Sequence, residues 1–110
     1  MWVELKGNPA SAGKARGKAK VVLTLGDIGK VEPGDILVVA FTTPSWTPLF
    51  ASVAAVVTET GGILSHAAVV AREYRLPAVV GVIGATALIT DGQWLEVDGS
   101  AGIVRLLAAV

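Results

Sequence analysis

The only histidine of the chain, His66, lies in a segment whose residue types suit a nucleophile at an anion site. Ser65, directly before it, is a residue type favoured as a helix N-cap, and Gly61 and Gly62 lie just upstream. If a helix begins after Ser65, His66 is its first residue, beside free backbone N–H groups and the positive end of the helix dipole. We therefore expect a neutral imidazole with an available lone pair at a place that binds phosphate.

The two glycines lack side chains, so a bulky anionic donor could approach the ring of His66 closely. A neutral nucleophile at an anion site is what a phosphoryl-accepting histidine requires. The residue pattern leaves a second interpretation open, in which His66 is a buried histidine satisfied by hydrogen bonds. Ser65 is a conceivable hydroxyl nucleophile, but no second base is apparent near it, and capping is the better explanation.

Three further polar residues are candidates for the walls of this site, namely Thr58, Glu59 and Thr43. Glu59 lies seven residues before His66, so its carboxylate either orients the ring as a hydrogen-bond acceptor or faces solvent. Together with the glycine pair and the N-cap serine, these residues form the expected phosphoryl-binding surface. A metal site is not expected, because one histidine without cysteine cannot make a zinc site and the carboxylates are scattered over turns.

The elements that must position these residues follow from three continuous valine-rich runs, at residues 36–40, 54–58 and 78–82. Continuous apolar runs are typical of parallel strands that are covered on both faces. The two connections have helical character: one lies around residues 47–52, with Pro48 in its first turn, and one runs over residues 65–74. The carboxyl ends of such strands meet at one edge of the sheet, so residues 42–43, 58–62 and 81–84 should converge beside His66.

The rest of the chain predicts shorter elements. We expect a loop or irregular hairpin over residues 11–19, a short helix within 83–89, and strands at 20–23, 93–97 and 103–107. Basic side chains alternate at Lys14, Arg16, Lys18 and Lys20, and residues 1–30 hold six basic and two acidic side chains. A phosphate- or nucleic-acid-binding patch is one interpretation. Without interleaved aromatic residues, we favour a solvated edge strand whose lysines block aggregation.

The composition is strongly apolar, at 53% hydrophobic residues with a mean hydropathy of +0.66. Prolines and hydroxyl residues interrupt the longest uncharged run, between Asp35 and Glu59, so a doubly covered sheet explains the bias better than a membrane span. The absence of cysteine fits a reducing compartment, and the N-terminus lacks a signal pattern. We expect a cytoplasmic protein that binds neither nucleic acid nor membrane.

Several ordered blocks of sequence resemble the mobile phosphohistidine domain of phosphoenolpyruvate-utilising enzymes. That family includes pyruvate-water dikinase, pyruvate-phosphate dikinase and rifampicin phosphotransferase. The resemblance extends over nearly the whole chain, and the phosphorylated histidine of the family falls on His66. The matching blocks are Gly7 and residues 10–13, 33–38, 43–46, 61–74, 76–81, 91–93 and 97–99.

The resemblance implies the swivelling β/β/α fold, an α/β fold with a small parallel sheet, short helices and an antiparallel β-layer, as one carrier domain over residues 1–110. It implies that an ATP-grasp-type nucleotide-binding domain phosphorylates His66, and that the domain then swings to a phosphoenolpyruvate or acceptor domain or subunit. Mg²⁺ and ATP are expected on those partners and no cofactor on this chain, which would be one component of a dikinase-type phosphotransferase. The alternative is a non-catalytic interaction or regulatory module that retains the fold.

One departure from the family pattern concerns Leu64. Many members have threonine two residues before the histidine, and in pyruvate-phosphate dikinases that threonine is a regulatory phosphorylation site. Leucine cannot accept phosphate, so this regulation is not carried over; leucine here is similar to the rifampicin phosphotransferase and phenylphosphate synthase branches. If Leu64 packs against the sheet beside the nucleophile, an aspartate in its place should impair folding or docking.

Overall fold

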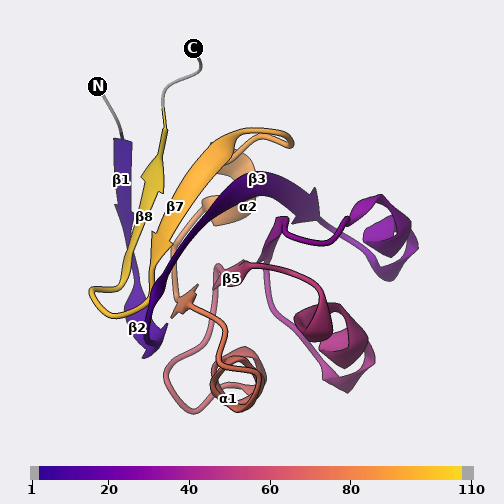
Figure 1. Ribbon diagram of the computed structural model, residues 1–110, viewed down its shortest axis with the longest axis horizontal. Helices are drawn as coiled ribbons and strands as arrows, with labels where there is room; N and C mark the ends of the chain where they lie inside the picture. The colour runs from indigo at the N-terminus through magenta and orange to yellow at the C-terminus, as the bar shows by residue number, and fades with distance from the viewer. Residues whose placement is uncertain (1–2, 108–110) are drawn as a thin grey trace.

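The computed structural model describes residues 3–107, in which eight strands form one mixed sheet and four short helices flank it (Figure 1). The strand order is β1-β8-β7-β3-β4-β5-β6-β2. The strands are β1 (Val3–Lys6), β2 (Asn8–Ser11), β3 (Lys14–Val22), β4 (Ile36–Val39), β5 (Ala55–Thr58), β6 (Ala78–Val80), β7 (Trp94–Asp98) and β8 (Ile103–Leu106). The helices are η1 (Leu25–Lys30) and η2 (Pro44–Ala51), both 3₁₀, and α1 (His66–Glu73) and α2 (Ala85–Leu88).

The parallel part of the sheet consists of β3, β4, β5 and β6, and its three predicted strands are confirmed. Every residue of β4, β5 and β6 is buried, because helices cover both faces. On one face, η2 and α1 pack Phe50, Ala68 and Ala71 against the strands; on the other, α2 and the segment after it contribute Ala85 and Ile89 (Figure 1). Double coverage is the physical reason for the continuous valine runs.

The antiparallel layer consists of β1, β8, β7 and the first half of β3, and at the other edge of the sheet β2 pairs antiparallel with β6. The strand β3 joins the two parts, since residues 14–18 pair with β7 and residues 19–22 pair with β4. The prediction of a loop or hairpin over residues 11–19 is therefore wrong: most of this stretch belongs to the longest strand of the sheet. Local sequence did not reveal it, because small residues and lysines suit a strand only when partners distant in sequence pair with it.

We expected the alternating basic residues on an edge strand, and this prediction is wrong. They lie on β3, which is paired with β7 on one side and β4 on the other. Three of the four meet carboxylates of other elements: Lys14 Nζ lies 3.8 Å from Asp98 Oδ2, Arg16 Nε lies 2.8 Å from Glu96 Oε2, and Lys20 Nζ lies 3.7 Å from Asp35 Oδ2. Arg105 Nη1 also contacts Glu96, at 2.8 Å. Hydrogen bonds from Arg16 and then Arg105 hold the pKa of Glu96 below its usual range. These ion pairs tie β3 to β7 and β8, whereas Lys18 is exposed and has no carboxylate partner among the described residues.

Two further helices were predicted from local signals with approximate bounds, whereas η1 was not predicted. The first crossover helix begins at Pro44, three residues before the predicted start, with proline at its first position and Pro48 inside it. The predicted short helix within 83–89 is confirmed as α2, although it spans only Ala85–Leu88. None of the helices within residues 3–107 has the length and apolarity needed to cross a membrane.

Candidate functional site

The predicted cap of α1 is confirmed. Ser65 has extended backbone angles and its Oγ accepts a hydrogen bond from the Ala68 backbone N–H at 3.4 Å, so His66 is the first residue of the helix. The helix presses Ala67, Ala68 and Ala71 against the sheet, and side chains this small let its backbone approach the strands closely. The sheet therefore determines where the start of α1, and with it His66, is placed.

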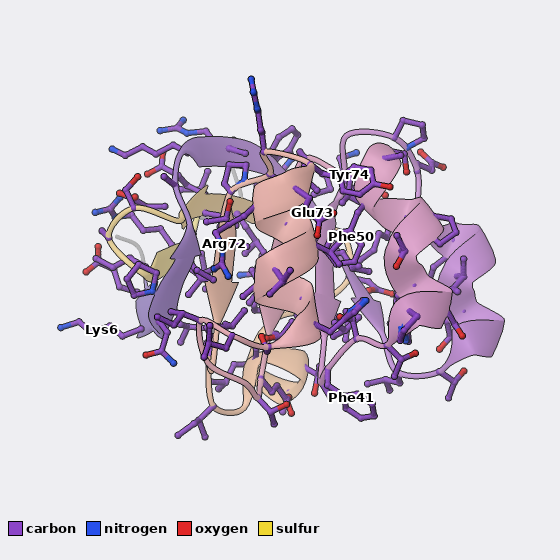
Figure 2. All side chains as sticks on the ribbon, turned by 90° about the horizontal axis from the view of Figure 1, so that it is seen from below. Lys6, Phe41, Phe50, Arg72, Glu73 and Tyr74 are labelled. Carbon is purple, nitrogen blue, oxygen red and sulfur yellow. The ribbon has the colours of Figure 1, made fainter. Side chains whose placement is uncertain are left out.

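The imidazole of His66 is held by two other elements. Its Nδ1 lies 2.8 Å from Oγ1 of Thr42, which follows β4 and is only 8% exposed. Its ring meets the edge of the buried Phe50 ring at a centroid distance of 6.4 Å and an interplanar angle of 87°. Figure 2 shows Phe50 lying between α1 and the neighbouring helix η2. Within residues 3–107, Nε2 has no hydrogen-bond partner, so the ring is fixed along one side and open at the other.

This geometry suits one tautomer for nucleophilic chemistry. When Nδ1 carries the proton, it donates to Thr42 Oγ1, which has acceptor lone pairs, and the lone pair of Nε2 is then free. Sequence reasoning placed residues 42–43 beside His66 but chose Thr43, and not Thr42, as the site residue. Successive side chains of an extended segment point to opposite sides, so only one of the two threonines can face the ring. The structure directs Thr42 to His66 and Thr43 into a groove beside the buried Trp46.

Glu59 and Thr58 stabilise the surroundings of the site and do not contact the ring. Oε1 of Glu59 accepts hydrogen bonds from the backbone N–H of Thr86, at 2.7 Å, and from its hydroxyl. The carboxylate thus binds the first turn of α2, which neither of our two interpretations anticipated. Thr58 is fully buried, and its hydroxyl donates to the carbonyl of Thr60 at 2.8 Å. This hydrogen bond stabilises the start of the loop after β5.

The loop between β5 and α1 is tied down at several points. The Thr60 hydroxyl donates to the carbonyl of Ala40 at 3.1 Å, and the guanidinium of Arg72 donates to the carbonyls of Ile63 and Ala10 at 2.7 and 2.8 Å. Within the described part of the chain, the backbone N–H groups of His66 and Ala67 donate to no protein acceptor. The start of α1 therefore offers donors for an anion beside the open side of the imidazole.

The two glycines of this loop have different roles. Gly61 has φ +98°, and a Cβ there would lie 2.8 Å from Cβ of Ser65, whereas a Cβ on Gly62 would meet no atom within 4 Å. Glycine is therefore required at position 61, both for its positive φ and for its close contact with the N-cap residue Ser65. At position 62 a side chain would point into unoccupied space. A ligand that approaches His66 closely would use that space.

We expect Gly61→Ala to lower the free energy of unfolding by about 1–3 kcal/mol, because strain at positive φ adds to the displacement of Ser65. Gly62→Ala should change it by less than about 0.5 kcal/mol, because the added methyl group meets no other atom. Denaturant unfolding of both variants, measured side by side, checks this pair. A Gly62→Ala protein as destabilised as Gly61→Ala would contradict it.

The side chain of Leu64 is 85% exposed, so the idea that it packs against the sheet is wrong. An aspartate here is no longer expected to impair folding, because nothing around the side chain would desolvate the carboxylate. Within residues 3–107, no group of three or more histidine or acidic residues is placed to hold a metal ion. Neither finding changes the geometry around His66.

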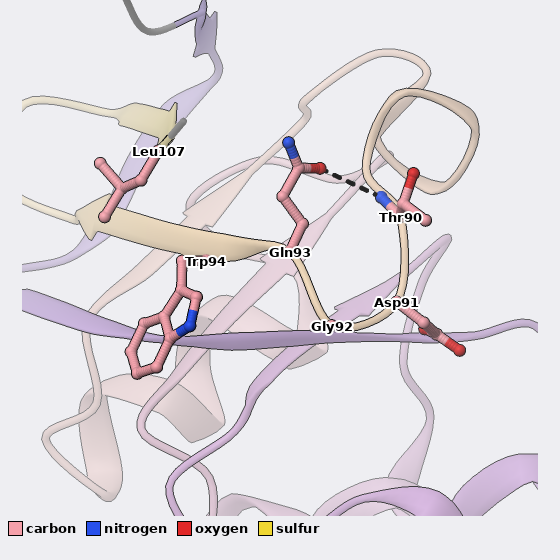
Figure 3. A pocket seen from close by; sticks show the side chains of 6 residues that line it. All are labelled: Thr90, Asp91, Gly92, Gln93, Trp94 and Leu107. Atoms are coloured by element: carbon pink, nitrogen blue, oxygen red, sulfur yellow. Dashed lines mark hydrogen bonds between the residues drawn. The ribbon is translucent and has the colours of Figure 1, made fainter. Parts of the chain in front are cut away.

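A second concavity lies on the antiparallel part of the sheet, where β7 begins (Figure 3). It has a volume of about 380 Å³ and is lined by Thr90, Asp91, Gly92, Gln93, Trp94 and Leu107. Oε1 of Gln93 accepts a hydrogen bond from the Thr90 backbone N–H at 3.3 Å, which closes the turn (Figure 3). None of its lining residues belongs to the His66 site, so it plays no part in the chemistry described here.

Comparisons with known proteins agree with this picture. The chain is 59% identical over 104 residues to chondramide synthase of Chondromyces crocatus, covering 94% of this chain and 3% of that protein. It is 54% identical over 101 residues to rifampicin phosphotransferase of Bacillus cereus, covering 92% of this chain and 12% of that protein. The chain thus spans a small fraction of the length of these relatives.

Among solved structures, the solution structure of an Enzyme I protein aligns with a TM-score of 0.62 and 33% identity, over 72% of this chain and 33% of that one. The family model described as the mobile domain of PEP-utilising enzymes matches residues 31–102, which include β4 to α2, His66 and Thr42. The mixed eight-stranded sheet with few short helices fits this family. The chain belongs to the family of mobile domains of phosphoenolpyruvate-utilising enzymes.

Proposed function

We propose that the chain is a phosphoryl-carrier domain, over residues 1–110, in which Nε2 of His66 accepts a phosphoryl group and passes it on. The observation that carries the proposal is the ring held at one nitrogen: Thr42 holds Nδ1 at 2.8 Å, and Nε2 has no hydrogen-bond partner among the described residues. The backbone N–H groups of His66 and Ala67, at the start of the same helix, have no acceptor there either. A histidine with a purely structural role would more often have both ring nitrogens satisfied.

The transfer step follows from this arrangement. The lone pair of Nε2 forms a bond to phosphorus while the P–O bond to the donor breaks, and the leaving oxygen keeps the electrons of that bond. The ring retains its Nδ1 proton, which Thr42 Oγ1 stabilises as positive charge develops on the imidazole. In the second half of the cycle, an acceptor oxygen forms a bond to the same phosphorus while the P–N bond breaks, and Nε2 takes back the electron pair of that bond. A hydroxyl acceptor gives its proton to a base of the acceptor domain.

Other domains are needed for both halves of this cycle. The described residues contain no cluster that could hold Mg²⁺, and the curated relatives are many times longer than this chain. We therefore assign ATP and Mg²⁺ to an ATP-grasp-type nucleotide-binding partner and the second reaction to an acceptor domain. The acceptor is either pyruvate, giving phosphoenolpyruvate, or a hydroxyl compound. Reacting atoms must come within about 3–3.5 Å, so one histidine that serves two separate sites has to move between them.

The purified chain is expected to show no ATP hydrolysis of its own. The sequence has no glycine-rich phosphate loop followed by Gly-Lys-Ser/Thr, and the described residues hold no cluster that could bind Mg²⁺. It should become labelled when a cognate ATP-binding component, Mg²⁺ and ATP labelled in its β- and γ-phosphates are added. Incorporation of labelled phosphate into the chain and release of free phosphate from ATP are measured in parallel. Steady ATP consumption by the contaminant-free chain would make it a self-contained enzyme, and absence of label with an active partner would favour a non-catalytic interaction module.

A further inference from the structure

Large apolar side chains are exposed at the edge of the sheet where His66 lies. Five of them follow the carboxyl ends of the four parallel strands: Leu23 after β3, Phe41 after β4, Ile63 and Leu64 after β5, and Ile83 after β6. Leu64 and Ile83 are 85% and 88% exposed. We call these five residues the apolar rim. In Figure 2, Phe41 projects outward at the end of α1 opposite to Tyr74, which is the end where His66 begins the helix.

A groove lies within this rim. It has a volume of about 260 Å³, and Leu23, Phe41, Thr43 and Trp46 are among its lining residues, none of which is charged. Thr43 is the immediate neighbour of Thr42, so the groove lies next to the residue that holds the imidazole. Apolar pockets at the centre of an interface commonly receive one large anchoring side chain from the partner.

The same edge carries almost no charge. Residues 40–58, 60–71 and 76–90 contain no aspartate, glutamate, lysine or arginine. The one charged residue between them at this edge, Glu59, has its carboxylate bound to Thr86, and the guanidinium of Arg72 is bound to two carbonyls. After β3, the next charged residue is Asp27, an anion, while Lys30 is paired with Asp91 at 2.8 Å.

A phosphoryl group carries roughly −1.5 to −2 charge near neutral pH. Transfer of such a group is ordinarily assisted by arginine, lysine or metal ions that neutralise the developing charge. Within residues 3–107, this face of the chain provides backbone N–H groups but no uncommitted cation. The cations must therefore come from whatever covers the face during the reaction.

On the basis of the proposed carrier function, we propose that the apolar rim and its groove are the docking surface for the nucleotide-binding partner domain. That domain places an apolar side chain in the groove, packs an apolar margin against the rim, and supplies all the cations for transfer to His66. The large part of the relatives that lies outside this chain provides room for such a domain, and its cationic centre would complement the phosphoryl group. Docking is then driven by apolar burial and depends little on salt.

The test uses a cognate nucleotide-binding component, purified separately, with this chain as its protein substrate at varied concentration. Leu64→Asp and Phe41→Asp should each raise the KM for the chain by about tenfold or more, because docking would bury an unpaired carboxylate. The kcat at saturation and the melting temperature should stay near wild type, since both side chains are exposed. The matched control is Val3→Asp, which alters an apolar residue of similar exposure, 58%, on β1 and should change neither parameter.

For the wild-type chain, KM should change by less than about threefold between low salt and roughly 0.5 M KCl, where charge-driven docking is strongly screened. Wild-type KM for both rim variants, or a steep rise of the wild-type KM with salt, would overturn the docking proposal. Rim variants that are charged normally from ATP but discharge slowly to the acceptor would assign the rim to the acceptor domain and overturn it as well. Failure of the wild-type chain to be labelled at all would instead refute the carrier function.

Discussion

His66→Ala is expected to abolish phosphoryl acceptance by the reconstituted system while the protein remains folded. Nε2 of His66 is the open ring nitrogen beside the free N–H groups of α1, and alanine offers no nucleophile in its place. Stability should fall by about 1–2 kcal/mol, because the buried Thr42 hydroxyl loses its partner. Incorporation of labelled phosphate from ATP checks the prediction. Intact mass and melting temperature show that the variant protein is complete and folded.

Two variants serve as controls for this result. Ser65→Ala keeps the nucleophile and should still be labelled, with a loss of about 1 kcal/mol in stability from the missing cap. Thr42→Val removes the hydroxyl that holds Nδ1 and should slow labelling by about tenfold, as expected for one lost hydrogen bond. In the wild type, the label should be lost in acid and retained in alkali, as a phosphoramidate is. Alkali-labile label that persists in His66→Ala would point to a hydroxyl nucleophile instead.

Gly99→Ala is expected to have the largest effect on stability of any single methyl addition that we consider. A Cβ at residue 99 would lie 1.7 Å from the carbonyl oxygen of Ser11 and 2.9 Å from the backbone nitrogen of Ala78. Backbone atoms cannot move aside as a flexible side chain can, so β2 or β6 would have to shift. We expect a loss of about 3 kcal/mol or more, which lowers the melting temperature by at least roughly 12 °C in a domain of this size.

Gly29→Ala is the matched control, because a Cβ there meets no atom within 4 Å and the residue does not have positive φ. Its stability should lie within about 0.5 kcal/mol of wild type. Urea or thermal unfolding of the two variants, monitored side by side, makes the comparison. Equal stability of both proteins would show that the close contact between residue 99 and β2 is not present in solution.

Much of the parallel layer and of α1 could be predicted from the sequence, because their signals are local. A strand buried on both faces needs apolar residues at successive positions, and residues 36–39, 55–58 and 78–80 satisfy this without reference to one another. A helix start needs a side-chain acceptor at its cap, and Ser65 supplies one three residues from its donor. The placement of His66 at the start of a helix followed directly from these two signals.

The antiparallel layer was harder to predict, since its pairing depends on residues far apart in the chain. The strand β3 is stabilised by β7, whose residues lie about eighty positions away, and by ion pairs such as Arg16 with Glu96. Lysine and glycine give a strand little intrinsic preference. The same residues would suit a loop if those partners were absent, so a local pattern could not distinguish the two.

The sequence by itself determined that a lone histidine follows a serine cap at the carboxyl edge of a parallel sheet, because short-range sterics and hydrogen bonding decide caps and covered strands. Only the tertiary structure decided that Thr42 and not Thr43 holds its ring, that Glu59 binds the first turn of α2, and that Leu64 faces solvent. The first two depend on hydrogen bonds between residues 24 and 27 positions apart, and the third on which surfaces the folded chain leaves uncovered. The residue pattern of a single segment does not specify contacts with other segments. These contacts are decided only when the helices and strands pack together.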